Sequence, residues 1–421
     1  MKPVQERNWA GNVVYGARRL HRPTSIEALQ QLVAAAPRIR VLGSRHSFNT
    51  IADSSELVSL QQLPSELDVD RAAGTASCGA GLTYGELAPR LHAEGLALAN
   101  LGSLPHISVG GSVATATHGS GDRNGNLATA VAGLELVTST GELIAFRRGD
   151  ADFNGLVVGL GALGVVTRIT LDVEPAYEIS QRVYENLSWQ SLDTHFDEIT
   201  AAGYSVSVFT RWDDLAGQLW VKRRVHDAAP PEPDELFGAR AATRQLNPIA
   251  GGDPDGCTRQ LATAGPWHER LPHFRLEFRP SAGAELQSEY LLPRRHARAA
   301  IEALRRLAPR IQPLLYVAEI RTVAADELWM SPQYGRDTVA IHFTWHRDQT
   351  RVEQLLSALE DVLAPFAPRP HWGKLFLAEA ATITARYERF ADFAGLLARL
   401  DPRGAFHNDW LETRLLGAGG P

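Results

Sequence analysis

Short apolar runs alternate with clusters of glycine through the first 175 residues of the chain. Such runs, bounded by turn-forming residues, are typical of short strands. Helical spacing of apolar residues occurs instead at 83–94 and stops before Gly95, which predicts a helix that ends there. The pattern therefore predicts a small α/β region. Its expected strands are residues 38–42, 57–60, 67–69, 75–79, 134–137, 143–146 and 164–173.

Longer strands and helices follow Pro175. A stretch rich in Pro, Gly and Asp at 228–265 interrupts them, and we expect it to be irregular and exposed. The mixed order of strands and helices favours an antiparallel sheet covered on one face by helices. The expected strands are 204–211, 218–224, 284–291, 314–323 and 337–346, and the expected helices are 192–202, 293–307, 351–363 and 381–400.

The length of 421 residues predicts two or three domains. We expect a first domain at 1–175, a second at 176–374, and a C-terminal segment at 375–421 that returns to the first domain. Residues 406–408 are expected to pack there.

Charge and cysteine content exclude several classes of protein. The 42 basic against 48 acidic residues give a net charge of −6, which leaves no excess of positive charge for nucleic acid. The longest nearly uncharged apolar stretch, 155–167, is too short to cross a membrane, and the N-terminus lacks a secretory pattern. Cys78 and Cys257 are then expected to be free thiols. We expect a cytoplasmic monomer without nucleic-acid or membrane partners.

Three familiar chemical motifs are absent or out of context. The G-x-G-x-x-G at 159–164 is followed by β-branched, alternating residues, so a strand follows it and not the helix that a nicotinamide-dinucleotide site needs. No G-x-S-x-G is present, which argues against an α/β-hydrolase. His268 and His273 lack a third ligand nearby in sequence, so no metal site is expected.

Two glycine-rich segments carry more information. Residues 41–49 follow an expected strand and present consecutive backbone N–H groups beside small hydroxylated side chains, an arrangement that suits a pyrophosphate. Residues 100–121 contain many glycines and few large side chains, which lets the backbone approach a flat, extended ligand. Together they predict a dinucleotide-cofactor site, although each alone could be an ordinary loop.

These segments also carry a resemblance. The strand followed by S-R-H-S, and then the segment G-S-L-P-H-I-S-V-G-G-S-V-A-T-A-T-H-G-S-G, resemble FAD flavoproteins of the vanillyl-alcohol-oxidase type. The motifs GPWHERLPHF, EIRTVAAD and RPHWGK are similar to those of the alditol oxidases within that group. The resemblance spans nearly the full length and implies a two-domain α+β flavoprotein. Its FAD-binding domain would contain two small α/β subdomains, and its substrate domain a large antiparallel sheet flanked by helices.

The resemblance implies that FAD is attached covalently through His46. Arg45 departs from the pattern, since many relatives carry glycine there, and its side chain must point away from the flavin or reach a phosphate. The FAD contacts that the resemblance implies are Val41, Leu42, Gly43, Ser44, Arg45, Ser47, Asn100, Ser103, Ser108, Gly111, Thr115, Ala116, Thr117, His118, Val166 and His371.

Polar residues recur at positions i and i+2 in the second region, and such positions share one face of a strand. Burying these groups without partners would be costly. They therefore form either an internal network or solvated face, or a floor that binds a polyhydroxylated substrate. The resemblance favours the floor, because it implies substrate contacts there. The residues are Gln287, Glu319, Arg321, His342 and Thr344, with Ser103 and Lys374 closing the site.

The expected activity is oxidation of the terminal primary alcohol of an alditol such as xylitol or sorbitol, with hydride transfer from C1 to flavin N5 and reduction of O2 to H2O2. His342 is the candidate base, because neutral imidazole suits that task. Arg321 and Lys374 would balance developing negative charge, and Gly102 would leave room for O2. The alternatives are an aldonolactone oxidase or dehydrogenase of the same fold, and a flavin- or carbohydrate-binding protein without turnover.

Overall fold

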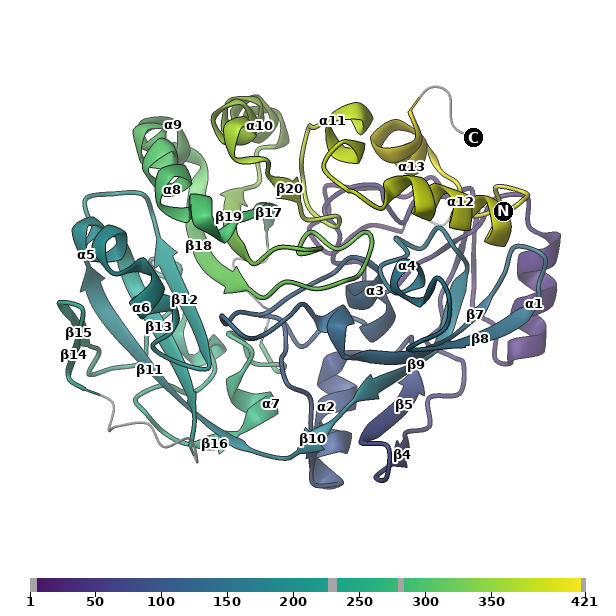
Figure 1. Ribbon diagram of the computed structural model, residues 1–421, viewed down its shortest axis with the longest axis horizontal. Coiled ribbons are helices and arrows are strands. Elements are labelled where there is room, and N and C mark those ends of the chain that lie inside the picture. Colours follow the sequence, from purple (N-terminus) through teal and green to yellow (C-terminus); the bar gives the residue numbers. More distant parts are fainter. Residues whose placement is uncertain (1–5, 226–232, 279–283, 418–421) are drawn as a thin grey trace.

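Three small sheets, one of them the two-stranded pair of β6 (Leu96–Ala97) and β10 (Glu174–Pro175), and one large sheet organise the described part of the chain (Figure 1). The computed structural model describes residues 6–225, 233–278 and 284–417. A parallel three-stranded sheet has the order β1 (Arg19–His21), β3 (Glu56–Val58), β2 (Arg40–Val41). An antiparallel five-stranded sheet has the order β4 (Asp68–Asp70), β5 (Thr75–Gly79), β9 (Val165–Asp172), β7 (Val131–Val137), β8 (Leu143–Arg147).

Local sequence explains these elements. In β9 every second residue, from Val165 to Leu171, is buried, which is the alternation that predicted the strand. Helix α2 (Tyr84–Ala93) begins with a capping box between Thr83 and Glu86. The other helices and strands of this half are α1 (Ile26–Ala35), β6 (Leu96–Ala97), α3 (Val109–Ala114), η1 (Leu127–Ala130), α4 (Phe153–Leu156) and β10 (Glu174–Pro175).

The large sheet is antiparallel throughout its named pairs. Its order is β14 (Glu235–Leu236), β15 (Ala239–Ala241), β11 (Glu178–Leu187), β13 (Gly217–Arg224), β12 (Ser205–Thr210), β18 (Leu315–Val323), β19 (Thr338–His346), β17 (Glu285–Pro293), β20 (Arg369–Pro370), and β16 (Gly265–Pro266) pairs with β11.

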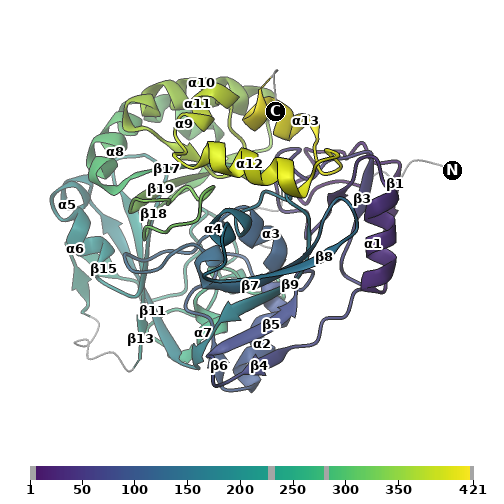
Figure 2. The same ribbon diagram turned by 45° about the vertical axis from the view of Figure 1, so that its right-hand side comes forward.

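Helices lie along the outer side of the large sheet, and its other side is turned toward the first region (Figures 1 and 2). The two-layer arrangement predicted from the sequence is therefore present. These helices are α5 (Trp189–Thr194), α6 (Phe196–Thr200), α8 (Ala297–Arg306), α9 (Ala308–Ile311) and α10 (Gln349–Leu363), with the turns η3 (Arg294–His296), η4 (Gln312–Leu314) and η5 (Ala364–Phe366) beside them. Helix α7 (Trp267–Arg270) packs instead against α2 and β11, and the turn η2 (Pro254–Gly256) lies in the loop between β15 and β16.

Some expected elements are divided or shifted. The helix expected at 192–202 is broken at His195 into α5 and α6, and the one expected at 381–400 forms α11 (Ala380–Thr384) and α12 (Phe390–Leu400). Helix α1 and strand β11 were not predicted.

The stretch expected to be irregular and exposed is only partly so. Its residues 228–232 lie outside the described residues. Leu246, Ile249 and Cys257 are buried in a small core with Phe209 and Trp220, because this loop packs on the cavity side of strands β11, β13, β12 and β18. The expectation of exposure therefore holds at least in part for most of the described residues of this stretch but fails for the buried part of the loop.

The C-terminal segment lies against the first region. Helix α12 packs beside α4 (Figure 2). The Nδ2 of Asn408 donates to the carbonyls of Thr50, Ile51 and Asp53 at 2.8–3.2 Å. The segment continues through α13 (Asp409–Leu411) and a π-helical turn, Glu412–Leu416. Among the described residues, no helix combines the length and the apolar character needed to cross a bilayer.

Candidate active site

A long cavity separates the glycine-rich segments from the inner face of the large sheet. One end is lined by Arg40, Leu136 and Gly161 of the first region. The other end reaches Gln287 and Thr344 on the sheet. Both halves of the molecule therefore contribute to a single elongated site.

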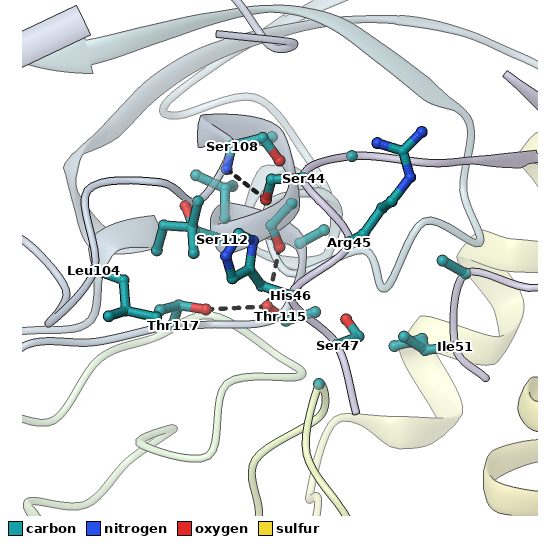
Figure 3. A pocket seen from close by; sticks show the side chains of 18 of the residues that line it. Ser44, Arg45, His46, Ser47, Ile51, Leu104, Ser108, Ser112, Thr115 and Thr117 are labelled. Atoms are coloured by element: carbon teal, nitrogen blue, oxygen red, sulfur yellow. Dashed lines mark hydrogen bonds between the residues drawn. The ribbon is translucent and has the colours of Figure 1, made fainter. Parts of the chain in front are cut away.

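The two glycine-rich segments are locked together at one side of this cavity. The backbone N–H of Ser108 donates to Ser44 Oγ at 3.0 Å (Figure 3). A Cβ added to Gly43 or Gly111 would lie 2.7 or 2.8 Å from Ser108 Oγ, closer than real Cβ atoms approach. A side chain at either position would force the Ser108 hydroxyl to move, and with glycine there bare backbone lines the cavity. Such a cradle fits an extended dinucleotide.

His46 lies in this cradle with its two ring nitrogens buried. Among the described residues, neither nitrogen has a hydrogen-bond partner. Burial, reinforced by His106, lowers the pKa of His46 to about 4, so its imidazole is neutral near pH 7. The ring stacks on Trp9 with centroids 5.7 Å apart. An unpartnered buried polar group costs about 1–3 kcal/mol, so this site fits a group that bonds to the ring.

Arg45 adopts the left-handed conformation, with φ 64°. This region favours glycine, so arginine is an unusual residue at this position. The side chain points away from His46 (Figure 3), and its guanidinium lies 3.0 Å from Glu6 Oε2. The turn therefore accommodates arginine without filling the cradle.

The register of the large sheet brings the predicted polar side chains into rows. Glu289 on β17 pairs with His342 on β19, which pairs with Glu319 on β18. In the next row Gln287 pairs with Thr344. All five line the cavity. They form what we call the polar floor, together with Arg321 and Lys374.

Glu289, which was not singled out from the sequence, is the centre of this floor. Its fully buried carboxylate lies 2.6 Å from Arg321 and 2.6 Å from Lys374 Nζ. Nε2 of His118, from the second glycine-rich segment, is 3.2 Å away. Burial disfavours its charged form, but Lys374, His118 and Arg321 outweigh burial and hold the pKa of Glu289 well below its usual range. Its position two residues after Gln287 was the missed signal, since such residues share a strand face.

Lys374 also contacts His342. Its Nζ is 2.7 Å from His342 Nδ1, and His342 Nε2 is 3.1 Å from Thr344 Oγ1. Because an ammonium group donates to Nδ1, the imidazole proton is assigned to Nε2, which donates to Thr344. Burial and the Lys374 charge lower the pKa of His342 to about 4, and burial lowers that of Lys374. The imidazole of His342 is therefore neutral at pH 7.

Glu319 is held from the opposite side of the floor. Its Oε1 is 2.9 Å from His273 Nε2, and its Oε2 is 3.5 Å from Arg321 Nε. Burial opposes ionisation, but Arg321 and His273 outweigh it and lower the pKa of Glu319. His273 received little weight in the sequence. It lies in an irregular loop, so no strand periodicity could have paired it with Glu319.

The cavity collects most of the predicted cofactor and substrate residues but not all of them. Asn100 lines a separate, smaller cavity beside Tyr84 and Arg123. Ala116 is buried outside the lining of the main cavity. Gly102 is also outside that lining, and a Cβ there would point toward Ile107 and Thr117 at 3.4 and 3.7 Å. The structure does not bring Asn100, Ala116 or Gly102 to the cavity surface.

Comparison with known proteins agrees with this architecture. A family model described as "FAD binding domain" matches residues 17–147, and one described as "D-arabinono-1,4-lactone oxidase" matches residues 284–414. The crystal structure of a cholesterol oxidase from B. sterolicum covers 96% of this chain and 95% of its own, with a TM-score of 0.76 and 14% identity. This likeness concerns the fold alone. The expected two-domain flavoprotein fold is confirmed, and the protein is an FAD-binding oxidoreductase.

Sequence relatives narrow the class further. The alditol oxidase of Streptomyces sp. (strain IKD472 / FERM P-14339) is 50% identical over 97% of this chain and 99% of its own length. An L-gulono-1,4-lactone dehydrogenase of Mycobacterium tuberculosis (strain ATCC 25618 / H37Rv) is 30% identical over 99% of this chain and 100% of its own. The chain belongs to the alditol oxidase family of flavoproteins, which confirms the resemblance seen in its motifs.

Proposed function

We propose that the protein oxidises the terminal primary alcohol of an alditol such as xylitol or sorbitol to the aldose, with O2 as the electron acceptor and H2O2 as the second product. The polar floor is the observation that carries this proposal. It presents carboxylate, guanidinium, ammonium and hydroxyl groups to one cavity, and a polyol needs both donors and acceptors along its length. The 50% identity to an alditol oxidase supports the same substrate class.

The cradle would hold FAD. In this proposal the backbone of residues 41–47 and the small residues Ser108, Gly111, Thr115 and Thr117 contact it, with Ser103, His118, Val166 and His371 beside it. When bound, FAD would supply the two-electron chemistry, namely acceptance of a hydride from the substrate carbon and return of the electrons to O2.

The chain's own residues manage charge and protons around the reacting hydroxyl. Arg321 and Lys374 stabilise negative charge that develops on the substrate oxygen. Glu289 keeps both cations in place, since it contacts each at 2.6 Å. Glu319 and Thr344 anchor hydroxyls farther along the polyol, with Gln287 and Ser103 at the edges of the site.

His342 remains the proposed base. Its Nδ1 is 2.7 Å from Lys374 Nζ, so the ammonium covers the nitrogen that is free to accept a proton. A proton can still reach Nδ1 if Lys374 passes one of its own protons to His342 and takes the hydroxyl proton in exchange. Nε2 keeps its proton and its contact with Thr344 during this transfer.

The first experiment tests the reaction. Xylitol added to the purified holoenzyme without oxygen should bleach the yellow flavin absorbance, and admission of air should restore it with formation of H2O2. A protein that only binds flavin or carbohydrate would not bleach. Either result decides between turnover and simple binding.

A lactone substrate is the second candidate function. The match of residues 284–414 to a D-arabinono-1,4-lactone oxidase model and the 30% identity to a gulonolactone dehydrogenase favour it. Steady-state assays with xylitol and L-gulono-1,4-lactone should give the higher kcat/KM for xylitol. A higher value for the lactone would reverse the assignment.

Covalent attachment of FAD through His46 is part of the proposal. The two unpartnered ring nitrogens of His46 support it. Acid precipitation of the wild-type protein should leave a yellow pellet, whereas His46→Ala should release its flavin into the supernatant. His195→Ala, an exposed histidine outside the cavity lining, is the control and should keep a yellow pellet. A colourless wild-type pellet would contradict the covalent bond.

The domain division at residues 175 and 374, the monomeric state and the cytoplasmic location stay predictions. The sheets support the division, because the five-stranded sheet ends with β9 at Asp172 and the large sheet begins with β11 at Glu178.

A further inference from the structure

A second buried lysine lies beside the polar floor, on the same face of the large sheet. Lys222 is on β13 and is 1% exposed. Its Nζ donates to the carbonyls of Leu271 and, at 3.1 Å, Pro272, and it is 3.3 Å from His273 Nδ1. His273 in turn reaches Glu319, as described above. None of the steps proposed for the reaction uses Lys222, yet a buried ammonium group is costly to retain.

The protonation state of Lys222 determines the tautomer of His273, because three acceptors surround the lysine nitrogen. An ammonium group has three N–H donors, which match the three acceptors. His273 Nδ1 then accepts, so its proton lies on Nε2, which donates to Glu319 Oε1 at 2.9 Å. A neutral amine has only two N–H donors and one lone pair. His273 would then donate from Nδ1 to Lys222, and the lone pair of Nε2 would face the carboxylate.

The other groups near this pair do not change charge near neutral pH. Glu319 and Arg321 face it from β18, and Cys257 faces it from the loop that covers the sheet. Burial raises the pKa of Cys257 to about 12, so this thiol stays neutral. Burial lowers the pKa of Lys222 to about 7. Lys222 is therefore charged below about pH 7 and loses its proton as the pH rises through that value.

We propose that Lys222 and His273 are positioning residues for substrate binding, in which protonated Lys222 fixes the tautomer of His273 and thereby orients Glu319. Glu319 Oε1 is occupied by His273, so Oε2 is left to accept a hydroxyl of the substrate. The inference rests on the proposed polyol oxidation, since Glu319 must be an acceptor for a hydroxylated substrate. Lys222 and His273 should affect substrate binding more than the chemical step, because neither of them contacts His342 or Lys374.

The test separates KM from kcat. With xylitol and the holoenzyme, wild-type KM should rise as the pH increases through about 7, while kcat changes little. Lys222→Met should raise KM about tenfold at pH 6, as expected for loss of a hydrogen bond to a charged group, and its KM should no longer vary between pH 6 and 8. Arg223→Met, at the neighbouring position whose side chain points to the opposite sheet face, is the control and should keep the wild-type KM and its pH dependence.

Substitution of His273 keeps the test decisive if Lys222→Met does not fold. The amide N–H of His273→Gln can donate to Glu319 whatever the state of Lys222, so its KM should stay near the low-pH wild-type value across the range. His273→Leu should raise KM at every pH. Unchanged KM and pH dependence in these variants, or a fall in kcat at constant KM, would overturn the inference while wild-type turnover still supports the polyol reaction. Wild-type protein that neither binds nor oxidises polyols would overturn both.

Discussion

Two lysine–histidine pairs lie on the same polar face of the large sheet, and they differ in where the carboxylate is placed. In the pair Lys374–His342, Glu289 contacts the lysine at 2.6 Å. In the pair Lys222–His273, Glu319 contacts the histidine at 2.9 Å, and the lysine is otherwise held by backbone carbonyls.

The position of the carboxylate decides which group holds its proton firmly. A carboxylate beside Lys374 stabilises the ammonium form, so positive charge is kept next to the proposed reacting carbon. Neutral carbonyls around Lys222 do not offset the burial that lowers its pKa to about 7. The first pair is therefore suited to constant charge during chemistry, and the second to a charge that responds to pH.

Glu289→Gln should break the first pair and have the largest effect. It would leave Arg321 and Lys374 as buried cations without their shared carboxylate, and breaking a buried pair costs about 3–5 kcal/mol. Thermal unfolding should show that loss, and kcat/KM should fall at least about a hundredfold. Glu302→Gln, which removes an exposed partner of Arg305, should change stability by less than about 1 kcal/mol. Similar unfolding temperatures for the two variants would contradict the central role of Glu289.

His342→Asn should sharpen the distinction between the pairs. Loss of a general base reduces kcat by about 10²–10⁴, and KM should change far less. In the wild type, burial and Lys374 lower the pKa of His342 to about 4. Because a base must be unprotonated to act, kcat should be constant from pH 5 to 8 and decline only toward pH 4. A main titration of kcat near pH 6.5 would show that His342 is not the base.

Thr344→Val should have the smallest effect of the three. It removes the acceptor that lies 3.1 Å from His342 Nε2, a neutral hydrogen bond worth about 1 kcal/mol, so kcat/KM should fall about fivefold. Ser207→Ala is the matching change beside His273, where the distance is 3.4 Å, and should alter kcat/KM less than about twofold. Equal losses of kcat/KM in the two variants would show that the hydrogen bonds of His342 and His273 matter equally, and would contradict the difference between the two pairs.

Local pattern was sufficient for much of the fold. The alternation in β9 and the i, i+2 pairs on β18 and β19 follow from strand geometry, which acts over a few residues. The same rule applied to β17 would have included Glu289 with Gln287. The partners of Lys222 could not be predicted this way, because His273 and two carbonyls come from an irregular loop about fifty residues later.

The resemblance to known flavoproteins located the cradle correctly, but it did not predict every residue that lines the cavity. His46, Gly43, Gly110 and Gly111 of the two segments line the cavity. Ala116 belongs to the second segment but is buried between Thr115 and Thr117, which do line the cavity, and Asn100 lines the smaller cavity instead. A motif therefore fixes the path of the backbone more firmly than the direction of each side chain.

Asn408 has a consequence for the order of events during synthesis. Its three contacts with the carbonyls of residues 50–53 mean that the wall of the cradle nearest the N-terminus is finished by residues near the end of the chain. Arg40, at the foot of the same cradle, likewise donates to the carbonyl of Phe406. The cradle is consequently incomplete until residues 406–408 have been synthesised and have packed against residues 40–53.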